Sequence, residues 1–127
     1  MNPNSTVLVV DDQPELRLLI KLTFSGTGCT VREAADGESA LAACAAEVPD
    51  VVLLDVMLPG IDGYEVCRRL KTEARLKKTL VVLMTAGDQA TERVRAREAG
   101  ADFYVPKPFS PAELLQLVMK HLPSEKS

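Results

Sequence analysis

The chain has 127 residues, of which 46% are hydrophobic and 26% charged, the proportions of an ordinary globular protein with one domain. Its formal net charge of −3 excludes a basic field with which the whole domain could hold nucleic acid. No apolar stretch approaches the ~20 residues that span a bilayer, and the N-terminus does not resemble a signal peptide. Three cysteines without CxxC spacing, each among apolar residues, indicate buried reduced thiols and a cytoplasmic protein; they are Cys29, Cys44 and Cys67.

The chain opens with a predicted strand, a helix and a second strand. Thr6–Val10 is a short apolar run typical of a strand buried on both faces, and Asp11 and Asp12 follow it. Pro14 suits the first turn of a helix. The apolar residues at helical spacing in that helix are Leu16, Leu19, Ile20 and Phe24. Thr30–Ala34 alternates apolar and charged residues, which predicts a strand with one face or edge near water.

A second helix, the most apolar strand and a third helix come next. Asp36 is a suitable N-cap for the second helix. The apolar face predicted for that helix is Leu41, Cys44, Ala45 and Val48. Val51–Asp55 brings four branched apolar residues directly to a carboxylate, so we expect a buried strand with Asp55 at its C-terminal end. Asp62 and Glu65 resemble a capping box, and the helix that they begin has the inner residues Val66, Cys67 and Leu70.

The last third of the chain contains two further strands and two helices. The strands are expected at Leu80–Met84 and Asp102–Val105. The helix between them, roughly Gln89 to Ala99, has so little apolar area to bury that we expect it to be the most weakly held. Its apolar anchors are Ala90, Val94, Ala96 and Ala99. Ser110 begins a capping box for the last helix, whose inner face is predicted to be Leu114, Leu115, Val118 and Leu122.

Five strands alternating with five helices predict an α/β fold with right-handed crossovers and a parallel sheet. Because the two more polar strands suit the sheet edges, the expected strand order is 2-1-3-4-5. Ligands of such sheets bind outside the carboxyl ends of the strands, at the switch point between the first and third strands. The side chains that this order brings to one rim are Asp11, Asp12, Asp55, Thr85 and Lys107.

Three carboxylates in one crevice repel one another, and desolvation makes the repulsion more costly, so the rim predicts a bound cation. Oxygen ligands beside a phosphate site suit Mg²⁺. Lys107 and the Thr85 hydroxyl would offer a positive charge and a hydrogen-bond donor to an anion that bridges the metal. A metal, a nucleophilic carboxylate, a lysine and a hydroxyl are the groups needed for phosphoryl transfer to an aspartate.

Four separated motifs occur in the order found in the receiver domain of two-component response regulators, and the chain resembles that family from about residue 6 to 122. The motifs are Val9–Asp12, Leu54–Gly63, Met84–Ala86 and Lys107–Phe109. The resemblance implies that residues 1–127 form a single receiver domain with polar termini. It also implies a flavodoxin-like (βα)5 fold with a doubly wound five-stranded parallel sheet.

The resemblance further assigns roles to the residues of the rim. Asp55 matches the phosphoacceptor, which takes its phosphoryl group from the phosphohistidine of a sensor histidine kinase or histidine phosphotransfer protein. Asp11 and Asp12 match the acidic pair that holds Mg²⁺ together with Asp55 and the backbone carbonyl of Met57. Thr85 and Lys107 match the residues that bind phosphoryl oxygens on the modified aspartate.

Other matches concern the response to phosphorylation. Tyr104 corresponds to the aromatic switch residue that turns inward when Thr85 is drawn to the phosphate, and Ala86 to the small residue beside it. The Lys107–Pro108 bond is typically cis in the family. The expected switch shifts the surface of the fourth helix, fifth strand and fifth helix, which controls a downstream protein target or an output domain. The protein would be a phosphoacceptor regulator and not an enzyme acting on other substrates.

The oligomeric state implied is a monomer or a weak phosphorylation-dependent dimer. Receivers linked to winged-helix DNA-binding domains usually have an acidic residue and an arginine that support a dimer, where this chain has Phe103 and Leu117. This departure argues against that particular dimer. We expect no direct contact of this domain with nucleic acid or membrane. We expect either a single-domain regulator that acts by protein contacts or a piece of a larger protein, since the residues from Pro123 onward are a polar tail.

Alternatives remain for the function and for single residues. A Mg²⁺-dependent phosphatase of the haloacid dehalogenase type would carry a second aspartate two residues after Asp55, where this chain has Met57, and would use a cap domain. A receiver-shaped binding module that is never phosphorylated is the third possibility. Tyr104 could simply pack at the sheet edge, and His121 suits a structural role. Arg93, Arg95 and Arg97 suit a solvated helix face.

Overall fold

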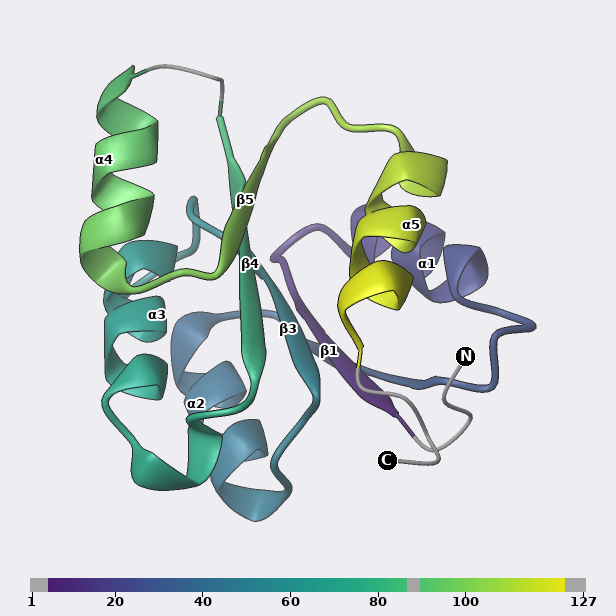
Figure 1. Ribbon diagram of the computed structural model, residues 1–127, viewed down its shortest axis with the longest axis horizontal. Coiled ribbons are helices and arrows are strands. Elements are labelled where there is room, and N and C mark those ends of the chain that lie inside the picture. Colours follow the sequence, from purple (N-terminus) through teal and green to yellow (C-terminus); the bar gives the residue numbers. More distant parts are fainter. Residues whose placement is uncertain (1–4, 87–89, 123–127) are drawn as a thin grey trace.

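The computed structural model describes residues 5–86 and 90–122, which form one parallel sheet with helices on both faces (Figure 1). The strands are β1 (Thr6–Val10), β2 (Thr30–Ala34), β3 (Val51–Asp55), β4 (Leu80–Thr85) and β5 (Phe103–Pro106). The helices are α1 (Pro14–Thr23), α2 (Gly37–Ala46), α3 (Gly63–Lys71), α4 (Ala90–Ala99) and α5 (Pro111–His121), with a short 3₁₀ helix at Ala74–Leu76.

The strand order is β2-β1-β3-β4-β5, and every pair of neighbours is parallel. The predicted fold class, five-stranded sheet and order are therefore confirmed. Helices α1 and α5 cover one face of the sheet, and α2, α3 and α4 cover the other (Figure 1). This doubly wound arrangement follows from right-handed crossovers whose direction reverses between β1 and β3.

Strand β3 lies at the centre of the sheet and divides its side chains between two apolar layers. Val51 and Leu53 pack with α1 and α5, whereas Val52 and Leu54 pack on the opposite face, and all four are fully buried. Burial of one such side chain stabilises the fold by roughly 1.5–3 kcal/mol. The strongly apolar strand is therefore held rigidly from both sides, which fixes the position of Asp55 at its end.

The inner faces of two helices differ from the predictions. In α2 the buried residues are Gly37, Ala40 and Cys44, whereas Ala45 is exposed. Val48 is also exposed and lies beyond the helix, which ends at Ala46. In α1 and at its C-cap, Ile20 and Phe24 are buried as the spacing suggests, but Leu19 is 42% exposed. Both segments are apolar on more than one face, so periodicity alone could not set the rotation of either helix on the sheet.

Helix α4 buries even less apolar surface than the sequence predicts. Only Ala96 and Ala99 are buried, whereas Ala90 is exposed and Val94 is 47% exposed. Gln89, the predicted first residue, lies outside the described residues. Gly100 ends the helix with a φ of +88°, and Ala101 N–H donates to the Ala96 carbonyl, which is a glycine C-cap. Two alanines hold this helix against the sheet by apolar contact.

The three cysteines are free thiols, and Cys44 and Cys67 are buried as predicted, while Cys29 is half-buried. Burial raises the pKa of both buried thiols to about 11, which makes them poor nucleophiles. Among residues 5–86 and 90–122 no helix is long and apolar enough to span a membrane.

Candidate functional site

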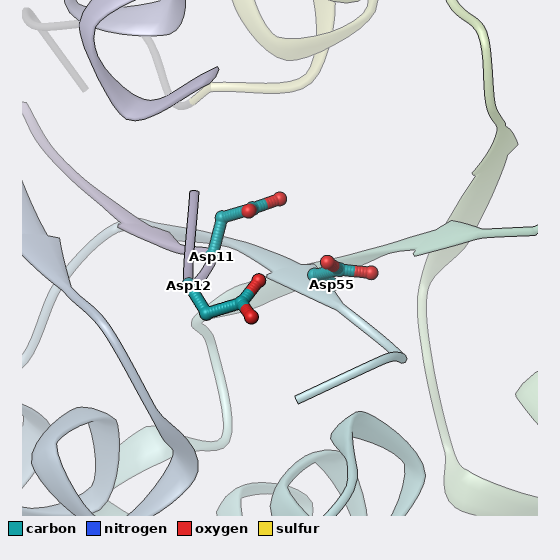
Figure 2. Close-up of side chains that lie close together, drawn as sticks. All are labelled: Asp11, Asp12 and Asp55. Carbon is teal, nitrogen blue, oxygen red and sulfur yellow. The ribbon is translucent and has the colours of Figure 1, made fainter. Parts of the chain in front are cut away.

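The predicted acidic cluster exists at the carboxyl ends of β1 and β3. Val10 pairs with Leu54 in the sheet, so the residues that follow them, Asp11 and Asp55, emerge side by side. Asp11, Asp12 and Asp55 each offer a carboxylate oxygen, and these oxygens all lie within 4.8 Å of one another (Figure 2). Asp11 and Asp55 are buried, whereas Asp12 is exposed and forms the solvent side of the group.

Backbone amides fix the orientation of the two buried carboxylates. Gln13 N–H donates to Asp11 Oδ1 at 2.8 Å, and Met57 N–H donates to Asp55 Oδ1 at 3.0 Å. Both bonds run from the amide two residues later in the chain, the short-range geometry in which an aspartate side chain favours a turn. Each turn also leads the backbone out of its strand, so the same residues end the strand and aim the carboxylate.

Lys107 crosses from the end of β5 to the acidic cluster. Its Nζ donates to Asp11 Oδ2 at 3.2 Å and to Asp55 Oδ2 at 3.1 Å. Its backbone N–H donates to the Thr85 carbonyl at 2.8 Å, which continues the β4–β5 pairing by one residue. The Lys107–Pro108 peptide bond is cis, as expected. The lysine therefore joins two carboxylates that come from different strands.

The charges of this group do not balance. Burial raises the pKa of Asp55; the Met57 amide and Lys107 oppose this change, and the Asp11 charge adds to it. For Lys107, burial alone would lower the pKa, but Asp55 and Asp11 outweigh burial and raise it. A single ammonium group therefore faces two buried carboxylates. The site thus retains excess negative charge that a further cation would neutralise.

The donor set fits a magnesium ion. Three carboxylates from two adjacent loops supply oxygen ligands, and Asp12 leaves the group open to water, as a cation that keeps several waters requires. The backbone carbonyl of Met57 stays a predicted fourth ligand. The Met57 side chain is 67% exposed and lies at the mouth of the site.

The other predicted residues lie along the same edge of the sheet. Thr85 ends β4 and is fully buried, one residue beyond Met84, which pairs with Asp55. Ala86 follows it and is exposed. Tyr104 in β5 pairs with Leu83 and is half-buried against the layer beneath α4. The structure thus brings Lys107 and the three aspartates together, with Thr85 on the neighbouring strand and Tyr104 one strand further.

Gly63 supports the site and was not among the predicted site residues. A Cβ atom at this position would lie 2.3 Å from the Asp55 carbonyl oxygen and 2.6 Å from Val56 Cα. The Gly63 N–H donates to the Val56 carbonyl at 3.0 Å, so the start of α3 is fastened to the backbone directly after the acceptor strand. The Asp-Gly pair before the helix was visible in the sequence, but its close approach to β3 was not.

A wider cavity of about 450 Å³ opens beside the acidic cluster. Its lining includes Asp12, Met57 and Ala86. It also includes three residues without a predicted role here, namely Tyr64, Glu92 and Arg95. From the sequence, Arg95 was interpreted only as part of a solvated helix face. No pattern among neighbouring residues connects it with a tyrosine on another helix.

The raised pKa of Asp55 makes the stability of the metal-free protein depend on pH. The folded state binds the Asp55 proton more tightly than the unfolded state, so proton binding at Asp55 stabilises the fold. This stabilisation is complete below the usual aspartate pKa, about 4, and is lost as pH rises through the raised pKa of Asp55.

Asp55→Asn cannot ionise and leaves Lys107 paired with Asp11. In EDTA we expect this variant to be more stable than the wild type at neutral pH by about 1 kcal/mol, with no difference below about pH 4. Urea unfolding at several pH values measures this, and a difference independent of pH would contradict it.

The fold and the site together define a doubly wound α/β protein with an acidic, lysine-paired pocket at its switch point. The profile of the response regulator receiver domain matches residues 7–119, and the chain belongs to this family. PilG of Pseudomonas aeruginosa is 36% identical over 118 residues, which cover 93% of this chain and 87% of PilG. The response regulator MprA of Mycolicibacterium vanbaalenii is 44% identical over 109 residues, which cover 86% of this chain.

Solved structures agree with this assignment. The chemotaxis response regulator CheY4 of Vibrio cholerae superposes with a TM-score of 0.86 at 29% identity, over 91% of this chain and 97% of that one. The chain spans only 46% of the length of MprA, however, so the family assignment concerns the receiver part of such longer relatives. The chain is therefore a receiver domain of two-component signalling.

Proposed function

We propose that the protein is a phosphorylation-controlled switch in which Asp55 accepts a phosphoryl group from the phosphohistidine of a sensor histidine kinase or a histidine phosphotransfer protein. The observation that carries the proposal is the grouping of a buried Asp55 with two further carboxylates and with the Lys107 ammonium group 3.1 Å away. Such a group pairs a nucleophilic oxygen with the cation binding that phosphoryl transfer requires.

In the transfer, a carboxylate oxygen of Asp55 attacks the phosphorus atom. The new O–P bond forms as the bond between phosphorus and the donor imidazole nitrogen breaks, and the electron pair of that bond stays on the nitrogen. Asp11, Asp12, Asp55 and the Met57 carbonyl would hold Mg²⁺, which neutralises phosphoryl charge when bound. The Met57 N–H keeps the acceptor carboxylate oriented throughout.

Phosphorylation changes the partners of the remaining groups. It adds a charge of about −1.5 to −2 at Asp55. Lys107 then pairs with a phosphoryl oxygen, and the Thr85 hydroxyl donates to another, which draws β4 toward the site and lets Tyr104 turn inward. Helix α4 follows because only two alanines hold it by apolar contact. Allosteric couplings of this kind amount to ~1–3 kcal/mol.

The receiving partner of the switch binds the surface of α4, β5 and α5. That partner is a downstream protein, or an output domain in a longer chain of the kind that MprA represents. We place the protein in the cytoplasm as a phosphoacceptor that takes part in its own phosphorylation and dephosphorylation. This receiver itself makes no contact with nucleic acid or membrane, and it is a monomer or a weak phosphorylation-dependent dimer.

Incubation with Mg²⁺ and acetyl phosphate, followed by intact mass measurement, tests the proposal. The wild-type protein is expected to gain one phosphoryl group, and EDTA is expected to prevent the gain because the three aspartates then lack their cation. A protein that stays unmodified over a range of Mg²⁺ and acetyl phosphate concentrations would instead be a receiver-shaped binding module. Modification that persists unchanged in EDTA would contradict the role of the metal.

A further inference from the structure

Helix α4 is held to α3 by polar contacts that its apolar content does not predict. The Tyr64 side chain in α3 is 4% exposed, and its hydroxyl donates a hydrogen bond to Glu92 Oε1 in the first turn of α4. The Arg95 guanidinium carbon lies 4.1 Å from the centre of the Tyr64 ring, on the same helix as Glu92. The two helices lie side by side on one face of the sheet (Figure 1).

These contacts reinforce one another. Arg95 Nη2 lies 4.0 Å from Asp62 Oδ2, so the arginine spans from the N-cap of α3 to the face of the tyrosine ring. A guanidinium group over an aromatic ring is favourable even at an exposed site, and the Arg95 side chain is 54% exposed. Burial and, next, the Glu92 carboxylate raise the pKa of Tyr64, so its hydroxyl remains a donor. Glu92 thus binds the hydroxyl of the buried Tyr64, and Arg95 contacts the face of its ring.

The position of the cluster relates it to the acceptor site. Tyr64, Glu92 and Arg95 line the same cavity as Asp12 and Ala86. Tyr64 directly follows Gly63, whose N–H is bonded to the backbone after Asp55. Tyr64 is therefore fastened to the loop that follows Asp55. Glu92 and Arg95 lie on α4, the helix that the proposed switch displaces.

We propose that Tyr64, Glu92 and Arg95 form a latch that fastens α4 to α3 in the unphosphorylated protein, so that releasing the latch favours the activated arrangement. The fastening is independent of the proposed function, whereas the effect on activation rests on it. The latch compensates for the scarcity of apolar contacts in α4, where Ala96 and Ala99 alone are buried. A helix held by one small polar cluster can be released as a unit, because its few contacts are shared.

Hydrogen–deuterium exchange of the unphosphorylated protein tests the fastening. Tyr64→Phe keeps the ring beneath Arg95 and removes only the hydroxyl. We expect backbone amides of α4 to exchange on the order of tenfold faster in this variant, the effect of one net hydrogen bond, with β1 and β3 unchanged. Glu92→Gln should act in the same direction. Glu98→Gln is the matched control, since it removes one exposed carboxylate from the same helix.

Acetyl phosphate titration with Mg²⁺ tests the effect on activation. If the latch exists only in the unphosphorylated arrangement, we expect Tyr64→Phe to reach half-maximal phosphorylation at several-fold lower acetyl phosphate than the wild type or Glu98→Gln, because the arrangement that the phosphoryl group favours is then already more populated.

The possible outcomes separate the two proposals. Unchanged α4 exchange in Tyr64→Phe overturns the latch, whatever the wild type does with acetyl phosphate. Exchange that rises equally in β1 and β3 also overturns it, because the tyrosine would then support the whole fold. Faster α4 exchange with unaltered phosphorylation refutes the regulatory role. A wild type that takes up no phosphate refutes the proposed function but leaves the exchange result intact.

Discussion

Replacing Asp55 with asparagine is expected to abolish phosphorylation by acetyl phosphate, by several orders of magnitude in rate, while the protein stays folded. The amide has the shape of the carboxylate but lacks its nucleophilic oxygen, and removal of a nucleophile elsewhere costs a comparable factor. The Met57 N–H can still donate to the amide oxygen, so the turn after β3 is preserved. Intact mass measurement over a time course, with Mg²⁺ present, gives the phosphorylated fraction.

The matched control lies at the other end of the same strand. Asp50 precedes β3, and its Oδ2 accepts a hydrogen bond from Thr6 N–H, a role that an amide oxygen can fill. Asp50→Asn should therefore be phosphorylated as fast as the wild type. If Asp55→Asn gained as much phosphate as the wild type, a different residue would be the acceptor, and the assignment made from the acidic cluster would be wrong.

Lys107→Met is expected to lower the free energy of unfolding by about 3 kcal/mol in EDTA at neutral pH. The variant leaves Asp11 and Asp55 buried and adjacent with no ammonium group, and breaking a buried ion pair from one side is costly. We place the cost at the lower end of the usual range because the Lys107 side chain is 27% exposed. Urea unfolding measures the loss, which should shrink in acid as Asp55, whose pKa is raised, takes up a proton.

Magnesium should restore much of the stability that Lys107→Met loses, since a cation bound by the aspartates neutralises the same excess charge. Lys77→Met removes an exposed lysine and should change the stability little in either condition. Equal losses for the two lysine variants would show that Lys107 does not compensate the buried carboxylates. A loss unaffected by Mg²⁺ would contradict the location of the metal site.

Much of the fold could be predicted because each strand is recognisable from its own residues. A strand such as Val51–Asp55, buried on both faces, needs apolar residues at every position, and this run is visible without knowledge of its neighbours. The polarity of Thr30–Ala34 likewise marked an edge strand, and β2 lies at the edge of the sheet. Once the strand order followed, the strand-end residues Asp11, Asp55 and Lys107 had to meet at one rim.

The helices were less predictable. An apolar pattern indicates that a helix forms, but it does not determine which of its faces packs against the sheet. Leu19 and Val48 have the expected spacing but are exposed, since the actual rotation and length depend on what the helix packs against. In α2, small side chains surround the helix, so several faces could have packed inward. Gly63 is a similar case, because only the approach of α3 to the backbone of β3 forbids a Cβ atom there.

The sequence by itself therefore determined the parallel sheet, its order and the residues that surround Asp55, because those follow from local burial patterns and from the right-handed rule for crossovers. Only the tertiary structure decided how Lys107 divides its hydrogen bonds between Asp11 and Asp55, and that Tyr64 meets Glu92, 28 residues later in the chain. Contacts between helices depend on the rotation and tilt that the whole core imposes on each helix. No local pattern contains that information.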